Sequence, residues 1–228
     1  MTQNQWDDYS SAFGHDDLIA VLSNRRYPGE GRSGRISFVR TVGLNSDNLA
    51  FPKQIHSGYV EIASRPGIVP NTDGIISPGG SIVCSIQVAD CIPLFLADPL
   101  NGIIGLVHAG WRGVEKRIIP DTVNKMVRKG GSRDGIIAFM GPSIRQCCFE
   151  IGPDVSKKFP IDCLINGNGD RSFLDLQRVA TNQLIHSQIL AKNILSSEEC
   201  TKCNPDKYFS YRRSGEKAGR MISVIGLT

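Results

Sequence analysis

The sequence predicts a single α+β domain, and three observations support this fold class. Two short apolar strands joined by turn residues lie within 92–107, and apolar side chains recur at helical spacing in 114–130 and 174–191. No internal repeat or shift in composition divides the chain. With 228 residues, of which 40% are hydrophobic, the chain can bury a sizeable core. We expect residues 16–228 to form this domain and the polar residues 1–15 to be a flexible segment.

The N-terminal half shows local patterns for one helix and several strands. An apolar stripe in residues 16–27 predicts a helix that Pro28 ends, and a flexible loop follows at 29–34. We also expect a turn at 45–48, a loop containing Asp73 at 66–74, and strands at 36–42, 59–62 and 81–88.

The C-terminal half alternates helices, strands and glycine-rich turns. Glycines end the helix at 114–130, in which Pro120 marks either a kink or the first turn. We expect the remaining elements to be a strand at 136–140, a short helix at 153–159, a turn at 166–170, a helix at 174–191 and strands at 208–212 and 221–227.

The strand predicted at 208–212 would set the orientation of two arginines. Successive side chains of a strand face opposite sides of the sheet. Ser210 and Arg212 would therefore share one face, and Arg213 would lie on the other. We expect Arg212, rather than Arg213, to point into a binding site.

The hairpin at 92–107 brings a thiol close to an imidazole. Residues 98–102, Asp-Pro-Leu-Asn-Gly, have strong turn chemistry. If Asp98 pairs with Ile103, the antiparallel register puts Pro93 opposite His108, and Cys91 lies diagonal to His108 on the same face. The two residues could be a catalytic pair, two metal ligands or ordinary core residues. Polar, glycine-rich turns beside both residues favour a site.

Composition and charge restrict the class of partner. The net charge of +4 is small and scattered, so it does not favour nucleic acid, but it is compatible with a small anion such as phosphate. The first residues lack the basic and apolar regions of a signal peptide, and no apolar run has the length of a membrane span. The seven cysteines are irregularly spaced. We therefore expect reduced thiols in a cytoplasmic protein.

A C-x-x-C motif occurs at Cys200 and Cys203. It could consist of structural thiols, form a redox pair or be half of a metal site. The chain contains no second C-x-x-C motif, so only Cys147 and Cys148 could complete a set of four thiolate ligands. The pattern alone leaves these three interpretations open.

Two segments of the chain are distinctive: VADCIPLFLADP at 88–99 and GLVHAGWRG at 105–113. Shorter segments accompany them, namely KQIHSG at 53–58, TDGIIS at 72–77, GPSI at 141–144, FEIG at 149–152, LDL at 174–176, CT at 200–201, FSYRR at 209–213 and GR at 219–220. Together, and in this order, they resemble the hallmark segments of the YfiH family, which is also called the laccase-domain, multicopper polyphenol oxidase or peptidoglycan editing factor family.

The resemblance implies a fold and an activity. The fold would be a layered αββα sandwich with mixed β-sheets, distantly similar to a bacterial deamidating toxin. The protein would be an enzyme that cleaves adenosine, inosine and methylthioadenosine by phosphorolysis, and that also deaminates adenosine. Its partners would be a small purine nucleoside and phosphate. The four histidines are too few for multicopper oxidation.

The resemblance also implies a metal site. His56, Cys91 and His108 would hold zinc, with copper as a possible alternative. Three protein ligands with an open fourth position are typical of catalytic zinc. The three residues lie far apart in the sequence, so their spacing alone does not reveal the set.

Other polar residues in the matching segments are candidates for catalysis and substrate binding. Cys91 and His108 are joined as catalytic candidates by Asp73 and Asp90, which could act as general acid or base or orient a ligand histidine. Asp90 could instead be a strand-end cap. Guanidinium groups bind phosphate in a bidentate way, and the candidate substrate ligands are Arg112, Ser143, Ser210, Arg212 and Arg220.

Two other functions remain open from the sequence. One is a cysteine hydrolase or amidase that acts on a peptidoglycan precursor, with Cys91 as nucleophile and His108 as base. The other is a non-enzymatic binding module that zinc stabilises.

Overall fold

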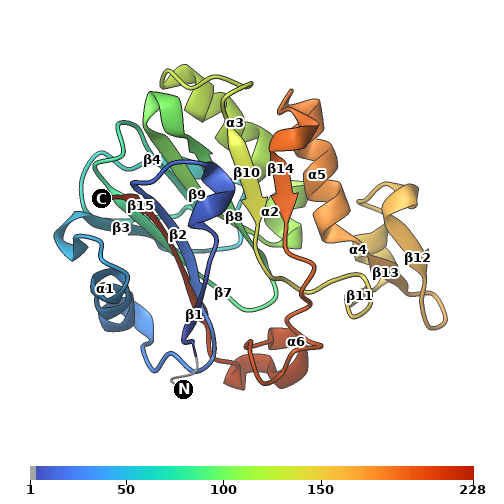
Figure 1. The fold of residues 1–228 in the computed structure, drawn as a ribbon. Coiled ribbons are helices and arrows are strands. Elements are labelled where there is room, and N and C mark those ends of the chain that lie inside the picture. Colours follow the sequence, from blue (N-terminus) through green and yellow to red (C-terminus); the bar gives the residue numbers. More distant parts are fainter. Residues whose placement is uncertain (1–3) are drawn as a thin grey trace.

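The computed structural model describes residues 4–228, which form four layers (Figure 1). Two six-stranded sheets face each other across a buried apolar cluster. Helix α1 covers the outer face of the first sheet, and helices α2, α3 and α5 cover the outer face of the second. The predicted αββα sandwich with mixed sheets is therefore confirmed.

The first sheet combines strands from both ends of the chain. It is antiparallel from β1 to β7 and parallel from β7 to β5. In spatial order its strands are β1 (Trp6–Asp8), β2 (Leu18–Ser23), β15 (Met221–Leu227), β7 (Val83–Val88), β3 (Leu49–Pro52) and β5 (Gly67–Val69).

The second sheet is built around the predicted hairpin. The antiparallel strands at its centre have parallel neighbours at both edges. In spatial order its strands are β14 (Ile194–Ser196), β10 (Ile137–Met140), β8 (Ile92–Asp98), β9 (Ile103–Ala109), β6 (Gly74–Ser77) and β4 (Val60–Ile62).

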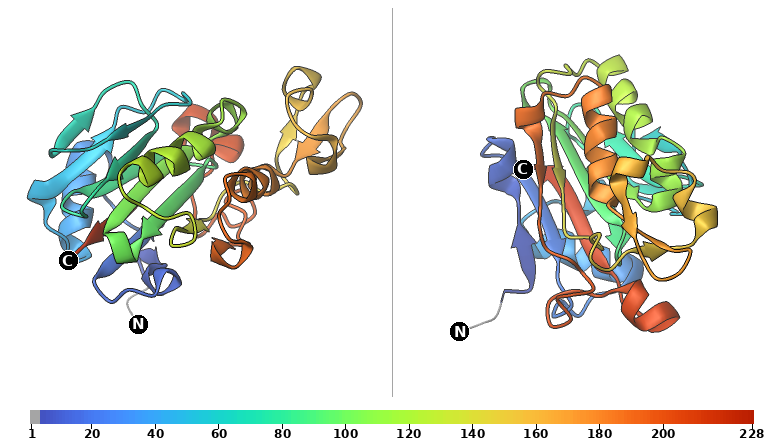
Figure 2. Two further views of the ribbon diagram at one scale, coloured as in Figure 1. Left: turned by 90° about the horizontal axis from the view of Figure 1, so that it is seen from above. Right: turned by 90° about the vertical axis from the view of Figure 1, so that its right-hand side faces the viewer.

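The helices are short, and a small third sheet projects from the side of the molecule (Figure 2). The helices are α1 (Gly31–Thr41), α2 (Trp111–Glu115), α3 (Ile118–Arg128), α4 (Pro153–Ser156), α5 (Leu176–His186) and α6 (Tyr211–Ser214). The third sheet has the order β11 (Glu150–Ile151), β13 (Ser172–Leu174) and β12 (Leu164–Asn166). Within residues 4–228, every helix is too short or too polar to span a bilayer.

The hairpin has the predicted register. Asp98 pairs with Ile103, and Pro93 lies opposite His108. Asp98 caps the turn by accepting a hydrogen bond from the backbone N–H of Asn101, and Gly102 has a φ of 64°, a left-handed conformation that glycine adopts without strain. The turn chemistry therefore sets the pairing of β8 and β9.

Strand direction brings several chain crossings to one edge of the sandwich. β3 and β7 are parallel neighbours, so their C-terminal ends lie side by side. The chain then crosses from each of them to the second sheet, through residues 53–59 and 89–91. β15 runs antiparallel to β7, so its first residue, Met221, pairs with Val88 at this same edge. Loops distant in sequence therefore meet beside the start of β8.

Two N-terminal predictions are wrong. Residues 16–27 contain strand β2 rather than a helix, because Leu18–Ser23 is apolar on both faces and such a run has no diagnostic period. Residues 31–41 form helix α1, rather than a loop at 29–34 followed by a strand at 36–42. Its buried residues Arg35, Phe38 and Val39 have helical spacing, although the glycines around them had favoured a loop.

Two further expectations fail at the chain ends. Residues 208–212 are not a strand, because Ser210 caps helix α6 by accepting the backbone N–H of Arg213. The argument from alternating faces therefore does not apply to Arg212 and Arg213. Residues 1–15 were expected to be flexible. Trp6–Asp8 pair with β2 and Ser10–Phe13 form a 3-10 turn, whereas residues 1–3 lie outside the part of the chain that the structure describes.

The remaining strand predictions agree with the structure within a few residues, whereas two helix predictions agree in part. The helix expected at 114–130 is divided between α2 and α3, because Arg117 has a left-handed backbone conformation, and the helix expected at 174–191 already ends at His186. The strands expected at 59–62, 81–88, 136–140 and 221–227 correspond to β4, β7, β10 and β15. Pro120 lies in the first turn of α3, where its missing N–H costs no helical hydrogen bond.

We propose that residues 16–228 form one domain, and limited proteolysis tests this. β15, from the C-terminal end, pairs with both β2 and β7, so a fragment of half the chain would lack central strands of the first sheet. We predict loop cleavage without a stable half-length product, as followed by mass spectrometry. A protease-resistant fragment of half the chain would contradict the proposal.

Candidate active site

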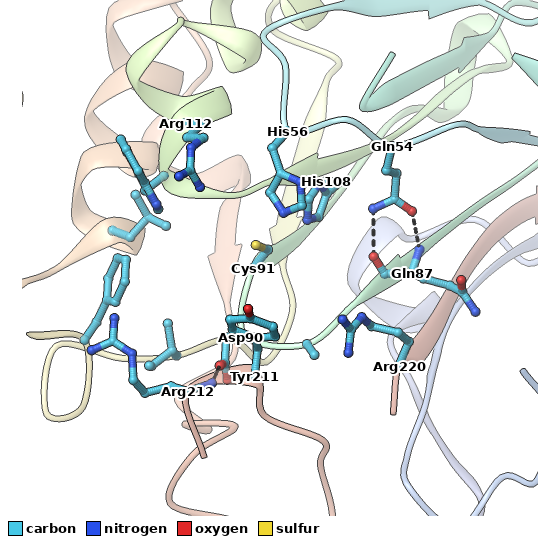
Figure 3. A pocket seen from close by; sticks show the side chains of 15 residues that line it. Gln54, His56, Gln87, Asp90, Cys91, His108, Arg112, Tyr211, Arg212 and Arg220 are labelled. Carbon is cyan, nitrogen blue, oxygen red and sulfur yellow. Dashed lines mark hydrogen bonds between the residues drawn. The ribbon is translucent and has the colours of Figure 1, made fainter. Parts of the chain in front are cut away.

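A cavity of about 580 Å³ opens at the edge where the chain crosses from the first sheet to the second. Its floor carries imidazole and thiol groups, and its rim carries arginines and aromatic rings (Figure 3). The lining residues are Gln54, His56, Gln87, Ala89, Asp90, Cys91, His108, Trp111, Arg112, Ile144, Phe149, Leu176, Tyr211, Arg212 and Arg220.

His56, Cys91 and His108 meet at the floor of this cavity. Their potential ligand atoms all lie within 4.8 Å of one another. Cys91 directly precedes β8, His108 lies near the end of β9, and His56 belongs to the loop between β3 and β4. The two imidazole rings are edge to face, with centroids 4.9 Å apart. The hairpin register and the parallel pairing of β3 with β7 together produce this convergence.

Asp73 lies behind the floor and orients both histidines. Its carboxylate is fully buried and accepts a 2.9 Å hydrogen bond from His108 Nδ1, which leaves Nε2 of that ring as the free nitrogen. The same carboxylate accepts the backbone N–H groups of Ile55, His56 and Ser57 at 3.2, 3.0 and 2.5 Å. One anion therefore holds the loop of one histidine and the ring of the other.

A second interaction holds the loop that carries His56. The side-chain amide of Gln54 donates to the Gln87 carbonyl and accepts the Gln87 backbone N–H, both at 2.8 Å, beyond the end of paired β3 (Figure 3). His56 itself has a φ of 57°. A non-glycine residue in this left-handed region costs about 1–3 kcal/mol. The backbone N–H groups that the loop donates to Asp73, and the bonds between Gln54 and Gln87, offset that strain.

Charges around the floor favour a thiolate. Burial raises the pKa of the Cys91 thiol, but His108, by charge and hydrogen bonding, and then His56 outweigh burial and lower this pKa to about 6. Burial also opposes ionisation of Asp73, yet hydrogen bonds from His108 and Ser57 lower its pKa to about 2. The site therefore presents an anionic sulfur to a ligand.

The small size of Gly110 gives the thiol its position. A Cβ atom at residue 110 would lie 2.8 Å from Cys91 Sγ and 3.8 Å from His56 Cδ2. The φ of Gly110 is −76°, so sterics rather than backbone conformation require glycine here. Gly113 is similar, because its Cβ would lie 2.9 Å from the Ser57 carbonyl oxygen.

Asp90 serves as an anchor for the C-terminal segment. Its carboxylate accepts hydrogen bonds from the Thr201 hydroxyl at 2.5 Å, the Ser210 hydroxyl at 3.0 Å and the Arg212 backbone N–H at 2.7 Å. These hydrogen bonds stabilise the left-handed backbone conformation of Asp90, which has a φ of 81° and directly precedes Cys91. Because its carboxylate already accepts these three hydrogen bonds, we infer that Asp90 positions the C-terminal segment rather than transferring a proton.

The three arginines at the cavity are fixed to different degrees. Arg212 donates to the Glu150 carbonyl at 2.6 Å and lies over the Phe149 ring. Arg220 donates to the carbonyls of Ala218 and Gly219. Arg112 stacks over Trp111, with its Cζ atom 4.4 Å from the ring centroid. Its side chain makes no hydrogen bond to any residue that the structure describes. Arg112 therefore has the most donors available to a ligand.

The two serines among the sequence candidates do not line the cavity. Ser143 is fully buried and accepts a hydrogen bond from Gln177, whereas Ser210 caps α6 and donates to Asp90. Arg213 also points elsewhere, since it donates to the carbonyls of Thr201, Lys202 and Tyr208.

Sequence reasoning missed part of the cavity wall. Gln87 was counted only as a strand residue, and Phe149 and Tyr211 only as parts of characteristic segments. The parallel pairing of β3 with β7 puts Gln87 beside the crossing loop at 53–59, a signal that needs the sheet order. Aromatic residues beside arginines, in Tyr211-Arg212 and Trp111-Arg112, are a local signal for a binding wall.

Residues 21–228 match a family model described as multi-copper polyphenol oxidoreductase laccase. The chain belongs to this family. Residues 21–228 include all three side chains at the cavity floor and the three arginines at its rim.

Proteins with curated names also resemble the chain over most of its length. Adenosine deaminase RL5, from an unknown prokaryotic organism, is 32% identical and aligns with 92% of this chain and 83% of its own. Purine nucleoside phosphorylase YlmD of Bacillus subtilis strain 168 is 34% identical, with coverage of 93% and 79%. The crystal structure of YlmD from Geobacillus stearothermophilus superposes with a TM-score of 0.90 at 23% identity, covering 100% and 97% of the two chains.

The floor of the cavity suits a single metal ion. One thiol and two imidazoles are ligands that zinc and copper both accept, and a set of three leaves a coordination position open to the cavity. The hydrogen bond between His108 and Asp73 is the kind of support that metal-binding histidines have.

We predict that Asp73→Asn lowers the affinity of this site for a metal ion by about 10- to 100-fold. An amide would set an N–H₂ group against the donors of His56, Ser57 and His108. Competition with a chelating dye measures the affinity.

The matched control for this prediction is Asp98→Asn. Asp98 is also fully buried and accepts backbone N–H groups, those of Asn101 and Ser132, but it lies at the far end of the hairpin. The Asp98→Asn substitution should lower the free energy of unfolding and leave the metal affinity of the cavity site unchanged. Equal losses of metal affinity in both variants would argue against a specific role for Asp73.

Proposed function

We propose that the protein is a zinc-dependent purine nucleoside phosphorylase that also deaminates adenosine. One observation carries the proposal: a set of metal ligands and three guanidinium groups face the same cavity. The activities for which RL5 and YlmD from Bacillus subtilis are named support it. The substrates would be adenosine, inosine or methylthioadenosine, with inorganic phosphate.

The arginines would hold phosphate beside the sugar. A guanidinium binds two oxygens of a phosphate dianion at once and offsets its charge. Arg112, Arg212 and Arg220 enter the cavity from three different segments, so no glycine-rich phosphate loop is needed. Trp111, Phe149 and Tyr211 offer aromatic faces that can stack with a purine.

The proposed reaction transfers the sugar from nitrogen to oxygen. A phosphate oxygen attacks C1′, the bond from C1′ to the purine nitrogen breaks, and its electron pair leaves with the base, which takes up a proton. A metal ion bound by His56, Cys91 and His108 would supply a Lewis acid next to the reacting groups. Asp73 keeps His108 in the tautomer that presents Nε2, and the apolar wall around Ile144 and Leu176 limits water.

Zinc is proposed over copper because three ligands and an open position are typical of catalytic zinc. A site of two histidines and one cysteine could also accept copper.

The seven free thiols support a cytoplasmic location, and the modest net charge of +4 does not favour a nucleic acid partner.

A cysteine hydrolase or amidase is the second candidate, and a specific geometry favours it. Asp73, His108 and Cys91 form a chain in which a carboxylate orients an imidazole beside a thiol of lowered pKa. His56 has no function in such a triad but completes a metal site. In metal-loaded protein, rapid alkylation of Cys91 by iodoacetamide would favour the hydrolase, because a metal-bound thiolate is protected.

A binding module stabilised by zinc is the third candidate. It requires that chelation unfold the protein and that no nucleoside be turned over. The enzyme proposal expects turnover by metal-loaded protein and its loss on chelation, while circular dichroism shows an intact fold.

We predict that purified, zinc-loaded protein converts adenosine or inosine to free base and ribose 1-phosphate only when phosphate is present. Liquid chromatography separates these products, and in the absence of phosphate adenosine should yield only inosine. Base release that does not depend on phosphate would overturn the phosphorylase assignment and favour a hydrolase.

We predict that Arg112→Ala raises the apparent KM for phosphate by about 10- to 150-fold at fixed nucleoside, the loss expected for a charge-assisted hydrogen bond of about 1.5–3 kcal/mol. Arg212→Ala should act in the same direction. Arg178→Ala, which removes an arginine paired with Asp162 on the surface, is the control and should change little.

Arg213, the neighbour of Arg212, is unsuitable as the control for these arginine substitutions. Its side chain donates to three backbone carbonyls and so holds the chain around residue 201 in place. An unchanged KM for phosphate in both the Arg112 and Arg212 variants would mean that phosphate binds elsewhere.

A further inference from the structure

Four of the seven cysteines gather at a place separate from the cavity floor. Cys147 and Cys148 come from the loop between β10 and β11, and Cys200 and Cys203 come from the loop between β14 and α6. Their sulfur atoms all lie within 4.8 Å of one another. None of the four lines the cavity or belongs to the group of His56, Cys91 and His108.

The spacing of the sulfurs is that of a tetrahedral site for one ion. A zinc–sulfur bond of about 2.3 Å in a regular tetrahedron separates the sulfurs by about 3.8 Å. Cys203 Sγ lies 3.8 Å from Cys147 Sγ and 3.4 Å from Cys148 Sγ. The four thiols therefore need to move little to bind an ion.

We propose that Cys147, Cys148, Cys200 and Cys203 bind a second zinc ion with a structural role. All four ligands are protein side chains, so the site is closed and has no position for a substrate. On binding, Zn²⁺ replaces the thiol protons, which pass to solvent, and no oxidant or reductant is needed.

The geometry argues against the other uses of four cysteines. A disulfide requires a sulfur–sulfur distance near 2.05 Å, whereas all four residues are free thiols with Cys203 in contact with two of the others. An iron–sulfur cluster places several irons and sulfides between its cysteines. A group whose sulfurs all lie within 4.8 Å has room for one ion only.

The surroundings of the four cysteines suit a negatively charged metal thiolate. The backbone N–H of Arg145 points to Cys200 Sγ at 3.5 Å. Arg213 donates to the carbonyls of Thr201 and Lys202, within the C-x-x-C turn, so a guanidinium lies close to the cluster and shapes the loop. Nearby positive charge offsets the two excess negative charges of a zinc ion with four thiolates.

The proposed ion would link two segments that lack regular structure. There is no helix or strand between Met140 and Glu150, nor between Ser196 and Tyr211, in the part of the chain that the structure describes. One isolated β-bridge, between Ser143 and Cys200, pairs the two segments, and Arg145 of the first segment also donates to the Ser197 carbonyl of the second. A metal cross-link supplies the stability that strand pairing does not give here.

This cross-link would support one wall of the cavity. The first segment carries Ile144 and Phe149, which line the cavity, and the second carries Thr201, whose hydroxyl binds Asp90. Loss of the ion is therefore expected to loosen the wall without removing any ligand from the cavity floor.

Metal analysis of the intact chain tests the proposal. Protein purified under reducing conditions and dialysed against a weak chelator should contain two zinc ions per chain. Cys147→Ser/Cys203→Ser should lose one of them and keep the other. Both side chains are exposed, so the change removes little packing. Cys163→Ala, which removes a thiol outside both groups, is the matched control and should retain two ions.

A cross-comparison separates this proposal from the function proposed above. Cys91→Ala should lose the zinc ion of the cavity and retain the one held by four cysteines, and the combination of all three substitutions should lose both. In Cys91→Ala protein, cobalt substitution should give the strong thiolate-to-metal absorption of a four-sulfur site. These readouts do not depend on nucleoside turnover.

Two outcomes would overturn the proposal. The first is one zinc ion in the wild type, none in Cys91→Ala, and four cysteines that a thiol reagent titrates freely in the folded protein. The second is a disulfide between Cys148 and Cys203 in protein purified without reductant and kept with zinc, as detected by peptide mass mapping.

Discussion

The carboxylate of Asp73 is the group on which the geometry of the site depends. It is fully buried and receives three consecutive backbone N–H groups from residues 55–57, together with the ring N–H of His108. Leaving a buried donor without its acceptor costs about 1–3 kcal/mol, so the loop and the ring are fixed together. His56 can then keep a strained backbone conformation, and the free nitrogen of His108 faces the cavity. A single buried anion thus joins the end of β9 to the loop that crosses between the sheets.

Local sequence was sufficient where turn chemistry and apolar pattern agreed. The turn at 98–102 predicted the register of β8 and β9, and with it the position of Pro93 opposite His108. It was insufficient at residues 18–23, where a run that is apolar on both faces suits a helix or a buried strand equally, and at 31–41, where glycines hid the helix. Residues 208–212 failed for another reason: the Ser210 side chain caps a helical turn, which overrides their strand-like composition.

The candidate site was predictable in its chemistry more than in its arrangement. His56 was identified only through the resemblance to a family. Its spacing in the sequence does not connect it with Cys91, because the two residues are brought together by the parallel pairing of β3 and β7. Sequence patterns cannot show which donors a carboxylate binds, so Asp90, which accepts three hydrogen bonds from the C-terminal segment, was ranked with Asp73 as a catalytic candidate. In the same way, Cys147 and Cys148 could be named as partners of the C-x-x-C motif, but their approach to it is visible only in three dimensions.

The last strand of the chain lies near the centre of the first sheet, between β2 and β7. The partners of Asp90 also come late, 111 to 122 positions further along the sequence. A ribosome delivers the N-terminal part first, so β2 and β7 remain without their common neighbour until Met221–Leu227 have left the exit tunnel. The nascent chain therefore exposes two open strand edges that can pair with other chains. The nascent chain, rather than the folded protein, is therefore the form most exposed to aggregation.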